Sequence, residues 1–338
     1  MNEITTVGLD LAKNVFHVVA LDAREREVLR KKLRRGQVLG LFAQLPRCVV
    51  GMEACGGAHY WARELERLGQ EVKLVAAQHV KAFVRGNKHD YNDARAIAEA
   101  VCRPGIRAVA VKTQAQQDIQ ALHRLRQGCV KQRTALANRV RGLVAEYGVV
   151  WPQGIHVVRR RLAELLEDAD HGLSETLRAA LAQAYEQLCE LDRHVTCYGA
   201  QIERLAKAND TCRRLQTIPG IGPLTASMLY ASFAQGEQFR RGRELAAALG
   251  IVPAQHSTGG KPRLLGISKR GDPYRRSLLV HGARSVVTRA TRQDDSLSRW
   301  INGVRARRGF NKAVVALANK LARIAWAVLH QHTVYRPA

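Results

Sequence analysis

The sequence predicts an α/β N-terminal domain, a long helical middle region and a mostly α-helical C-terminal domain. In the first hundred residues, β-rich runs alternate with segments of helical spacing. A coiled-coil-like apolar stripe follows over about 114–146, and beyond 211 helical segments are separated by glycine-rich interruptions. We therefore expect three parts, at residues 1–110, 111–210 and 211–338.

Strand and helix patterns alternate in the N-terminal part. The runs predict strands at 5–11, 15–21, 28–33, 48–52 and 71–76, and helices at 37–44, 60–68 and 92–102. Three early strands followed by strand–helix alternation imply a mixed sheet covered by helices. This order resembles the ribonuclease H fold.

The middle region is predicted to be an elongated helical hairpin. Its second helix is expected over about 174–207, and its first helix carries an apolar stripe with mostly three- and four-residue spacing. The stripe consists of Ile119, Leu122, Leu125, Cys129, Leu136, Val140 and Leu143. Two interpretations remain open, because such a stripe serves either a plain helical core or dimerisation.

The charge of the chain indicates a polyanionic partner. The formal net charge is +25, and residues 211–338 alone hold 22 Lys and Arg against 5 Asp and Glu. A surplus of this size carries a self-repulsion cost unless a polyanion offsets it, so nucleic acid is the expected partner. A membrane surface is not favoured, since no basic amphipathic helix with an aromatic face is visible.

Several protein classes are excluded by composition. The hydrophobic fraction of 46% is high enough for sizeable cores, so the chain is not disordered by composition. Neither a secretory signal nor a run of about 20 apolar residues is recognised, which predicts a cytoplasmic protein without a membrane span. Seven scattered cysteines with no Cys-x-x-Cys pair predict reduced, mostly buried thiols.

Four acidic residues stand out by position. Asp10 lies at the centre of an otherwise apolar strand, where a carboxylate is costly unless it is paired, hydrogen-bonded or metal-bound. Glu53 ends another apolar strand. Asp90 and Asp93 are three residues apart at the start of a predicted helix, so they share one helix face.

These four acids predict a metal site. Two strands of one sheet can end in carboxylates at the same edge, and converging carboxylates repel one another unless a cation neutralises them. Oxygen ligands favour Mg²⁺ or Mn²⁺, and two such ions about 4 Å apart can serve phosphoryl transfer. Simpler explanations exist for single residues: Asp90 as a helix N-cap, Asp93 as a first-turn acid and Glu53 as an ordinary strand end.

Three short segments carry these acids: residues 7–13 (VGLDLAK), 51–57 (GMEACGG) and 88–98 (KHDYNDARAIA). Together they resemble the signature blocks of the DEDD transposases of bacterial insertion sequences. The N-terminal domain of that family is similar to Holliday-junction resolvases, that is, RuvC-like. The resemblance implies that Asp10, Glu53, Asp90 and Asp93 bind divalent metal.

Residues 215–226 predict a helix, a tight turn and a second helix. The turn Pro219–Gly222 resembles a helix-hairpin-helix element. Its backbone amides, exposed at a helix N-terminus, would suit a phosphate oxygen, so Gly220 and Gly222 are candidate DNA contacts. A glycine-rich turn that binds no ligand is the alternative.

A second glycine-rich segment, residues 250–276, combines hydroxyl and basic side chains. Ser257 lies between His256 and Thr258. The expected phosphate clamps are Lys261, Lys269, Arg270, Arg275 and Arg276. From the residues alone, this is either a basic DNA-contacting loop or a loop that presents a hydroxyl to phosphate.

The same segment is similar to the C-terminal transposase domain of the DEDD family, in which a loop serine is the implied nucleophile that bonds transiently to a DNA phosphate. Ser257 matches that position best, with Thr258 as the neighbouring alternative. The serine proton could pass to His256 or to a carboxylate of the metal site.

The resemblance covers about residues 5–326. It further implies a non-coding bridge RNA, transcribed from the element, that pairs with donor and target DNA. It also implies tetramers in which the acidic domain of one subunit meets the serine domain of another.

The sequence therefore predicts a Mg²⁺-dependent recombinase that cuts and rejoins DNA for insertion-sequence transposition. One alternative is a hydrolytic nuclease or junction resolvase, in which the carboxylates activate water and Ser257 only contacts DNA. Another is a non-catalytic nucleic-acid-binding protein, in which the four acids are structural.

Overall fold

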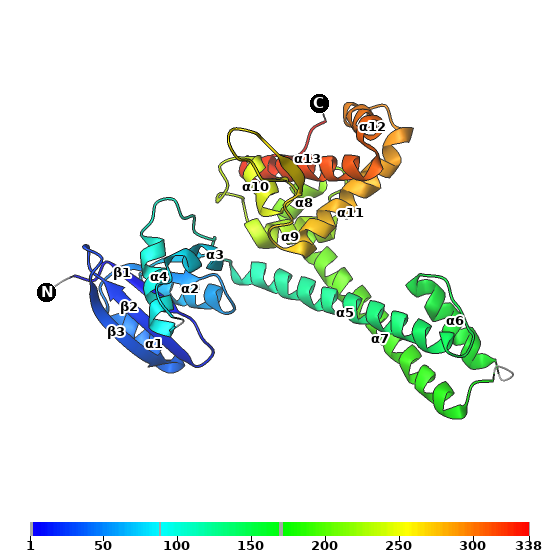
Figure 1. The fold of residues 1–338 in the computed structure, drawn as a ribbon, viewed down its shortest axis with the longest axis horizontal. Helices are drawn as coiled ribbons and strands as arrows, with labels where there is room; N and C mark the ends of the chain where they lie inside the picture. Colours follow the sequence, from blue (N-terminus) through cyan, green and yellow to red (C-terminus); the bar gives the residue numbers. More distant parts are fainter. Residues whose placement is uncertain (1–2, 88, 169–171, 338) are drawn as a thin grey trace. The chain divides into compact units, whose positions relative to one another are not determined.

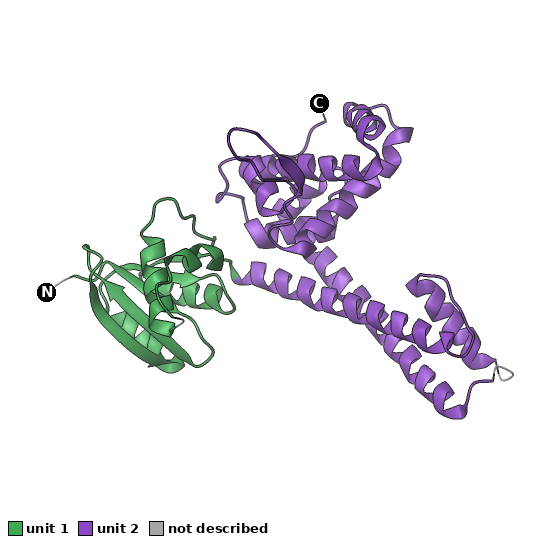
Figure 2. Ribbon diagram, in the orientation of Figure 1, with its two compact units in different colours: residues 1–113 green, residues 114–338 purple. Residues whose placement is uncertain are grey.

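The chain folds into two compact units, residues 1–113 and 114–338 (Figures 1 and 2). This computed structural model describes residues 3–87, 89–168 and 172–337. The division into three parts at 110 and 210 stays a prediction.

Unit 1 is built on a five-stranded sheet in the order β3-β2-β1-β4-β5. The strands are β1 (Thr6–Asp10), β2 (Val15–Leu21), β3 (Glu27–Arg34), β4 (Val49–Glu53) and β5 (Glu71–Val75). The first three strands pair antiparallel, whereas β1–β4 and β4–β5 pair parallel. This confirms the predicted mixed sheet, with strand ends that differ from the predicted ones by at most one residue.

Helices cover both faces of this sheet. They are η1 (Arg35–Gln37), α1 (Val38–Gln44), α2 (Ala58–Arg67), α3 (Ala77–Val80), η2 (Lys81–Phe83) and α4 (Asp90–Val101), of which α3 and η2 were not predicted. Alternate residues of β2 divide between the faces, because strand side chains alternate. Val18 belongs to the core under α1 and α2, whereas Val19 packs with Ala94 and Ala98 of α4.

Helix α4 lies unusually close to strand β1. A Cβ atom added at Gly8 would come within 1.9 Å of the carbonyl oxygen of Ala94, so only glycine fits there. Gly51 of the neighbouring strand faces Val101 and Ile97 in the same way, and a Cβ atom added there would lie 2.6 Å from a Val101 methyl carbon. Glycine within a strand marks such a close approach. These two glycines set the start of α4 beside the ends of β1 and β4.

Unit 2 begins with a helical hairpin, in which α5 (Gln114–Ala145) packs along α7 (Glu175–Ala208) (Figure 1). Both long helices agree with the sequence prediction. Helix α6 (Ile155–Glu167) lies between the two long helices in the sequence and was not predicted. It packs on both long helices and completes their core.

The predicted stripe of α5 is only partly the buried one. Leu125 and Leu143 are 52% and 46% exposed, while His123, Ala137 and Val144 are buried instead. The physical reason is that a straight helix repeats every 3.6 residues, so its buried face drifts from a seven-residue pattern. In addition, α5 packs against α9 (Pro223–Phe233) as well as α7.

The remainder of unit 2 is mostly helical, as predicted. Its elements are α8 (Asp210–Gln216), α9, α10 (Gly242–Ala248), β6 (Pro253–Gln255), β7 (Leu264–Ile267), α11 (Pro273–Arg289), η3 (Ala290–Arg292), α12 (Ser296–Arg308) and α13 (Phe310–His330). Strands β6 and β7 form an antiparallel hairpin. Helix α13 packs against α8, α10, α11 and α12, so it is the central helix of this core.

The expectation that no segment is long and apolar enough to cross a membrane was wrong for α13. By length and composition its 21 residues qualify, although half of the qualifying window is buried inside the protein. A central core helix is apolar on most of its surface for the same reason that a membrane helix is.

Candidate functional site

The ends of β1 and β4 place two carboxylates side by side. The parallel register pairs Leu9 with Met52, so Asp10 and Glu53 are the next residues on neighbouring strands. Both are half-buried at the same edge of the sheet. This edge is where a parallel sheet collects its functional groups.

The start of α4 adds two more carboxylates to this edge. Asp90 is the first residue of the helix and Asp93 lies in its first turn. The N-cap is His89, whose Nδ1 accepts a hydrogen bond from the Tyr91 amide at 3.2 Å. The simpler explanation of Asp90 as an N-cap was therefore wrong, and its carboxylate is free to face the sheet edge.

The charges of the other three acids act on Asp10. Burial, followed by the charges of Asp93, Asp90 and Glu53, raises the pKa of Asp10 to about 6. The pKa of Glu53 is raised by burial and by Asp93. Like charges at short range disfavour ionisation, so the structure brings all four predicted acids into one cluster. We call Asp10, Glu53, Asp90 and Asp93 the acidic cluster.

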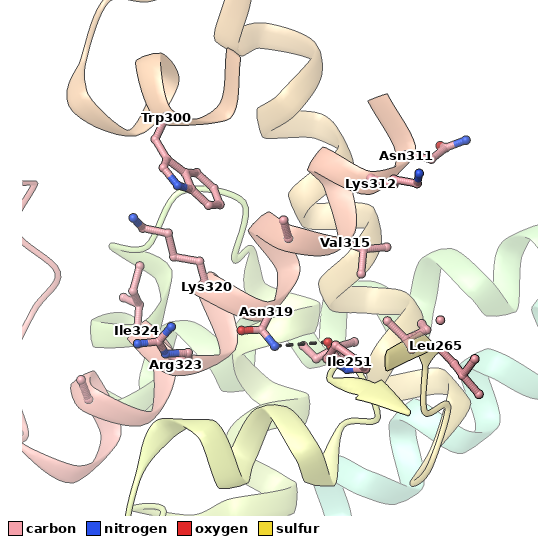
Figure 3. A pocket seen from close by; sticks show the side chains of 15 residues that line it. Ile251, Leu265, Trp300, Asn311, Lys312, Val315, Asn319, Lys320, Arg323 and Ile324 are labelled. Atoms are coloured by element: carbon pink, nitrogen blue, oxygen red, sulfur yellow. Dashed lines mark hydrogen bonds between the residues drawn. The ribbon is translucent and has the colours of Figure 1, made fainter. Parts of the chain in front are cut away.

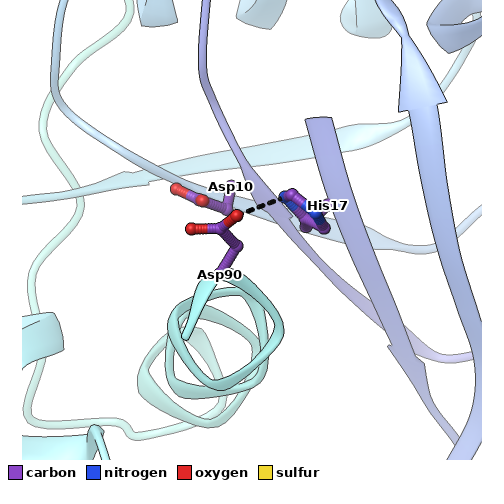
Figure 4. Close-up of side chains that lie close together, drawn as sticks. All are labelled: Asp10, His17 and Asp90. Carbon is purple, nitrogen blue, oxygen red and sulfur yellow. Dashed lines mark ion pairs between the residues drawn. The ribbon is translucent and has the colours of Figure 1, made fainter. Parts of the chain in front are cut away.

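His17 joins the acidic cluster and was missed in the sequence. It lies on β2 directly opposite Asp10 in the antiparallel register, and it is buried. Its Nδ1 atom is 3.5 Å from Asp90 Oδ2, without the geometry of a hydrogen bond (Figure 4). One ligand atom from each of Asp10, His17 and Asp90 can be chosen so that all lie within 4.8 Å of one another. In the sequence, this role of His17 was indicated only by the presence of a histidine inside an otherwise apolar strand.

The donor set of this cluster suits a divalent cation. Carboxylate oxygens are hard ligands, and an imidazole nitrogen is also compatible with a first-row metal such as Mn²⁺. No described lysine or arginine forms an ion pair with the four acids. Cys55 lies close by, but burial and the charges of Glu53 and Asp10 raise the pKa of its thiol, so it stays protonated. Among the described residues, the cluster is thus an oxygen-rich site without a lysine or arginine ion-pair partner.

In unit 2, Ser257 lies in the exposed loop of the β6–β7 hairpin. Its Oγ accepts hydrogen bonds from Gln255 Nε2 at 2.8 Å and from the Arg263 amide at 3.1 Å. The next residue, Thr258, bridges to Lys261 through the backbone. Two donated hydrogen bonds fix the position of the serine oxygen and favour negative charge on it.

The five basic residues predicted as phosphate clamps fall into two groups. Lys261, Lys269 and Arg270 are exposed. Arg276 instead donates hydrogen bonds to the carbonyl oxygens of Leu249 and Arg270, at 3.3 and 3.0 Å. Such contacts hold the segment after the hairpin against α10.

The fifth residue of this set, Arg275, is also engaged within the protein. It lies over the Phe233 ring, 5.4 Å from the centroid, and 3.5 Å from an Asp272 oxygen. Arg275 and Arg276 therefore have structural contacts that the sequence did not indicate.

The two glycines of the α8–α9 turn differ in their surroundings. Gly220 has a φ of +82°, and a Cβ atom there would come within 2.7 Å of the Gly282 carbonyl oxygen of α11. Gly222 is exposed, with nothing within 4 Å of an added Cβ. Gly220 is thus required for the turn to pack on α11, whereas Gly222 lies open at the N-terminus of α9.

A buried polar cluster joins α5, α9 and α11, and sequence reasoning missed it. His123 is fully buried, with Nε2 2.9 Å from Ser227 Oγ and Nδ1 2.9 Å from Tyr274 Oη. Because Ser227 donates its own hydrogen to the Pro223 carbonyl, His123 Nε2 is the donor to Ser227. Its Nδ1 then accepts from Tyr274. This network fixes the beginning of α11, directly after the basic segment.

Comparison with known proteins gives two family matches and several similar chains. Residues 7–149 match a DEDD-type transposase family of IS110 elements, and residues 212–298 match the transposase IS116/IS110/IS902 family. A probable family 20 transposase of Pseudomonas aeruginosa is 47% identical, covering 99% of both chains. The transposase for insertion sequence element IS1111A of Coxiella burnetii is 43% identical, covering 99% of this chain and 92% of that protein. The transposase for element IS1328 of Yersinia enterocolitica is 41% identical, covering 99% of both chains.

Proposed function

Because the chain belongs to the IS110/IS116 family of DEDD transposases, we propose that it cuts and rejoins DNA strands to move its own insertion element. In this proposal the acidic cluster binds two Mg²⁺ or Mn²⁺ ions, and Ser257 is the nucleophile. The DNA substrates are the donor and target sites.

One observation carries the proposal: the four carboxylates gather at one sheet edge, although burial and the charges of the other three raise the pKa of Asp10 to about 6. Such an arrangement is unfavourable by itself and becomes favourable when divalent cations are bound. When bound, these ions supply the Lewis acid that offsets charge on the phosphate. Asp10, Glu53, Asp90 and Asp93 would hold them, and His17 supports the position of Asp90.

The geometry around Ser257 supports this residue, rather than Thr258, as the nucleophile. Its oxygen accepts two hydrogen bonds, from Gln255 and from the Arg263 amide, and both favour the deprotonated form that attacks. Oγ would bond to phosphorus while one phosphorus–oxygen bond to a sugar breaks. The serine gives up its proton, and the departing sugar oxygen gains one. In the second transfer a sugar hydroxyl of the other strand attacks the same phosphorus, and the serine leaves and regains a proton.

A covalent serine–phosphate bond explains how strands could be rejoined without ATP, since the number of phosphoester bonds stays constant. The exposed cations Lys261, Lys269 and Arg270 lie in the hairpin loop and the following turn, where they would hold the flanking phosphates.

We extend the proposal to a bridge RNA and to a tetramer in which the acidic cluster of one subunit acts with Ser257 of another. The net charge of +25 supports simultaneous RNA and DNA binding. Sequencing of RNA that co-purifies with the protein tests the first part, and we expect element-derived RNA. Recovery of only bulk cellular RNA would contradict it. Light scattering of the protein–DNA complex tests the second part, the tetramer.

A covalent-trapping assay tests the nucleophile. The full chain is incubated with Mn²⁺ and an end-labelled duplex carrying the element end, and the protein is then separated under denaturing conditions. We expect a labelled adduct from the wild type and from Thr258→Ala, and none from Ser257→Ala. If Ser257→Ala cleaves the duplex at the wild-type rate without an adduct, hydrolysis by a junction-resolvase-like reaction is the correct function instead.

A further inference from the structure

Helix α13 has a second face that the core does not cover. Its buried stripe includes Leu317, Leu321 and Ala325, whereas the residues between these lie in an open groove of about 1110 Å³. The groove residues of α13 are Lys312, Val315, Ala316, Asn319, Lys320, Arg323, Ile324 and Ala327. They recur at three- and four-residue spacing, so they form one continuous face of the helix. We call this cavity the α13 groove.

Two other elements complete the walls. Figure 3 shows Trp300 of α12 on one side and Leu265 of β7 on the other. Leu265 is 50% exposed, and Lys320 Nζ lies 4.6 Å from the centre of a Trp300 ring. On the floor, Asn319 Nδ2 donates a hydrogen bond to the Ile251 carbonyl at 3.2 Å. The groove therefore combines a mostly apolar lining with one aromatic side chain and amide groups.

The charge of the groove has a single sign. Its lining includes Lys312, Lys320 and Arg323, and no acidic residue. No described acid pairs with these three cations, and neither α12 nor α13 contains an Asp or Glu. An apolar, aromatic-walled cavity with several cations at its rim suits a ligand that is both aromatic and anionic.

We propose that the α13 groove binds an unpaired base of the DNA strand, with Lys320 and Arg323 on the flanking phosphates. This deepens, and rests on, the proposed function. The groove is continuous with the β6–β7 hairpin, since Pro253 and Leu265 line it and the loop of the same hairpin carries Ser257. A strand that is cut and exchanged must separate from its complement, and the base beside the cut then loses its stacking partners.

The charge also argues against a second copy of the chain in this groove. A protein segment that fits beside three cations without a described acidic partner should carry acidic residues, but the chain has only 29 Asp and Glu against 54 Lys and Arg. Nucleic acid supplies a negative charge at every nucleotide, together with a base that can stack on an aromatic ring.

Binding of a fluorescein-labelled 20-nucleotide single strand, measured by anisotropy with the full chain, tests this proposal. The same sequence is measured as a duplex and as RNA. For Lys320→Gln/Arg323→Gln we expect about tenfold weaker single-stranded DNA binding and about twofold or less change for the duplex. The slope of the logarithm of the binding constant against the logarithm of the salt concentration should also become shallower, by about 0.7 for each lost phosphate contact.

A matched control separates groove contacts from general electrostatics. Arg307→Gln/Arg308→Gln removes the same charge from exposed residues of α12 outside the groove lining. It should lower single-strand and duplex binding equally and by less than the groove variant lowers single-strand binding. A third variant, Ala316→Phe, fills the groove without a charge change and should lower single-stranded DNA binding alone, with unfolding curves establishing that it folds.

Three outcomes would overturn the proposal: single-stranded DNA binding that is unchanged in both groove variants, losses that equal those of the control, or losses confined to RNA. The trapping assay keeps this test separate from the proposed function. A wild-type adduct on Ser257, together with unchanged single-strand binding in the groove variants, would reject the groove alone. Absence of any adduct would reject the nucleophile instead.

Discussion

The two units of this transposase distribute charges of the same sign in opposite ways. Unit 1 holds 19 Lys and Arg against 12 Asp and Glu, and it gathers four of its acids at one sheet edge. Unit 2 holds 35 Lys and Arg against 17 acids, and it spreads its cations over exposed loops and helix faces. The concentrated charge suits a partner as small as an ion, whereas the dispersed charge suits an extended polyanion.

The two charge distributions place different requirements on the backbone of each unit. Convergent carboxylates need neighbouring elements held within a few ångströms, which Gly8 provides by letting α4 approach β1. Dispersed cations need no such precision, because each can contact a phosphate separately. Unit 2 uses a comparable glycine contact, between Gly220 and Gly282, for packing the α8–α9 turn on α11.

The largest expected effect is that of Asp10→Asn on strand cleavage. Removal of one carboxylate from the cluster should lower the cleavage rate more than about a thousandfold, since metal-ion catalysis contributes several kcal/mol to the barrier. DNA affinity should stay within about twofold, because the proposed phosphate contacts belong to unit 2. The measurement is the single-turnover rate on labelled DNA. Asp294→Asn, at a side chain that is 92% exposed, is the matched control. Wild-type cleavage by Asp10→Asn would favour a non-catalytic protein.

Gly8→Ala should damage unit 1 through packing. The new methyl group would lie 1.9 Å from the Ala94 carbonyl oxygen, so α4 must move and the free energy of unfolding should fall by about 3 kcal/mol. Urea denaturation and Mn²⁺ titration measure the two consequences. Gly40→Ala, where an added Cβ meets nothing within 4 Å, should leave Mn²⁺ binding unchanged.

A glycine substitution in unit 2 tests whether the two units respond independently. Gly282→Ala places a methyl group 2.0 Å from the Gly220 carbonyl oxygen, while Gly222→Ala meets nothing within 4 Å. We expect Gly282→Ala to destabilise unit 2 and weaken DNA binding, with Mn²⁺ affinity unchanged. Loss of Mn²⁺ binding in this variant would show that the two units do not behave independently.

Acidification should destabilise unit 2 more than unit 1. Burial and the nearby Arg126 lower the pKa of His123 to about 4, below its ordinary value of 6.5. Between these values the unfolded chain binds more protons, so stability falls as the pH falls from 6.5 to 4, by up to about 3 kcal/mol. In unit 1 the pKa of His59 is also lowered to about 4, but the raised pKa of Asp10 acts in the opposite direction.

Hydrogen exchange resolved by peptide measures this difference between the units. His123→Gln should remove most of the acid sensitivity of unit 2, whereas His281→Gln, at an exposed residue of α11, should not. Equal loss of protection in both units between pH 6.5 and 4 would contradict the expected contrast.

The smallest effect concerns the stability of the ion-free protein. Since the pKa of Asp10 is raised to about 6, its ionisation is unfavourable in the folded state above that pH. Without divalent ions at pH 7.5, Asp10→Asn should therefore be more stable than the wild type, by about 1–2 kcal/mol after allowance for solvent screening. The advantage should vanish near pH 4, and Mg²⁺ should reverse the order by stabilising only the wild type. Thermal unfolding with and without Mg²⁺ measures both.

The sequence alone predicted the mixed sheet, both long helices and the identity of the four clustered acids. These features are local: strand alternation, helical spacing and a carboxylate within an apolar run are each visible in a few neighbouring residues. The family resemblance was carried by short motifs around the same acids, and family membership was then established by matches along the chain.

Tertiary structure decided the features that depend on residues far apart in the sequence. His17 joins the acidic cluster only because β2 pairs with β1 in one particular register. Arg276 contacts backbone carbonyls, and His123 contacts Ser227 and Tyr274, because the helices that carry them pack together. A periodic pattern specifies which face of an element is buried, but not what that face meets, since the partner is chosen by packing across the whole unit.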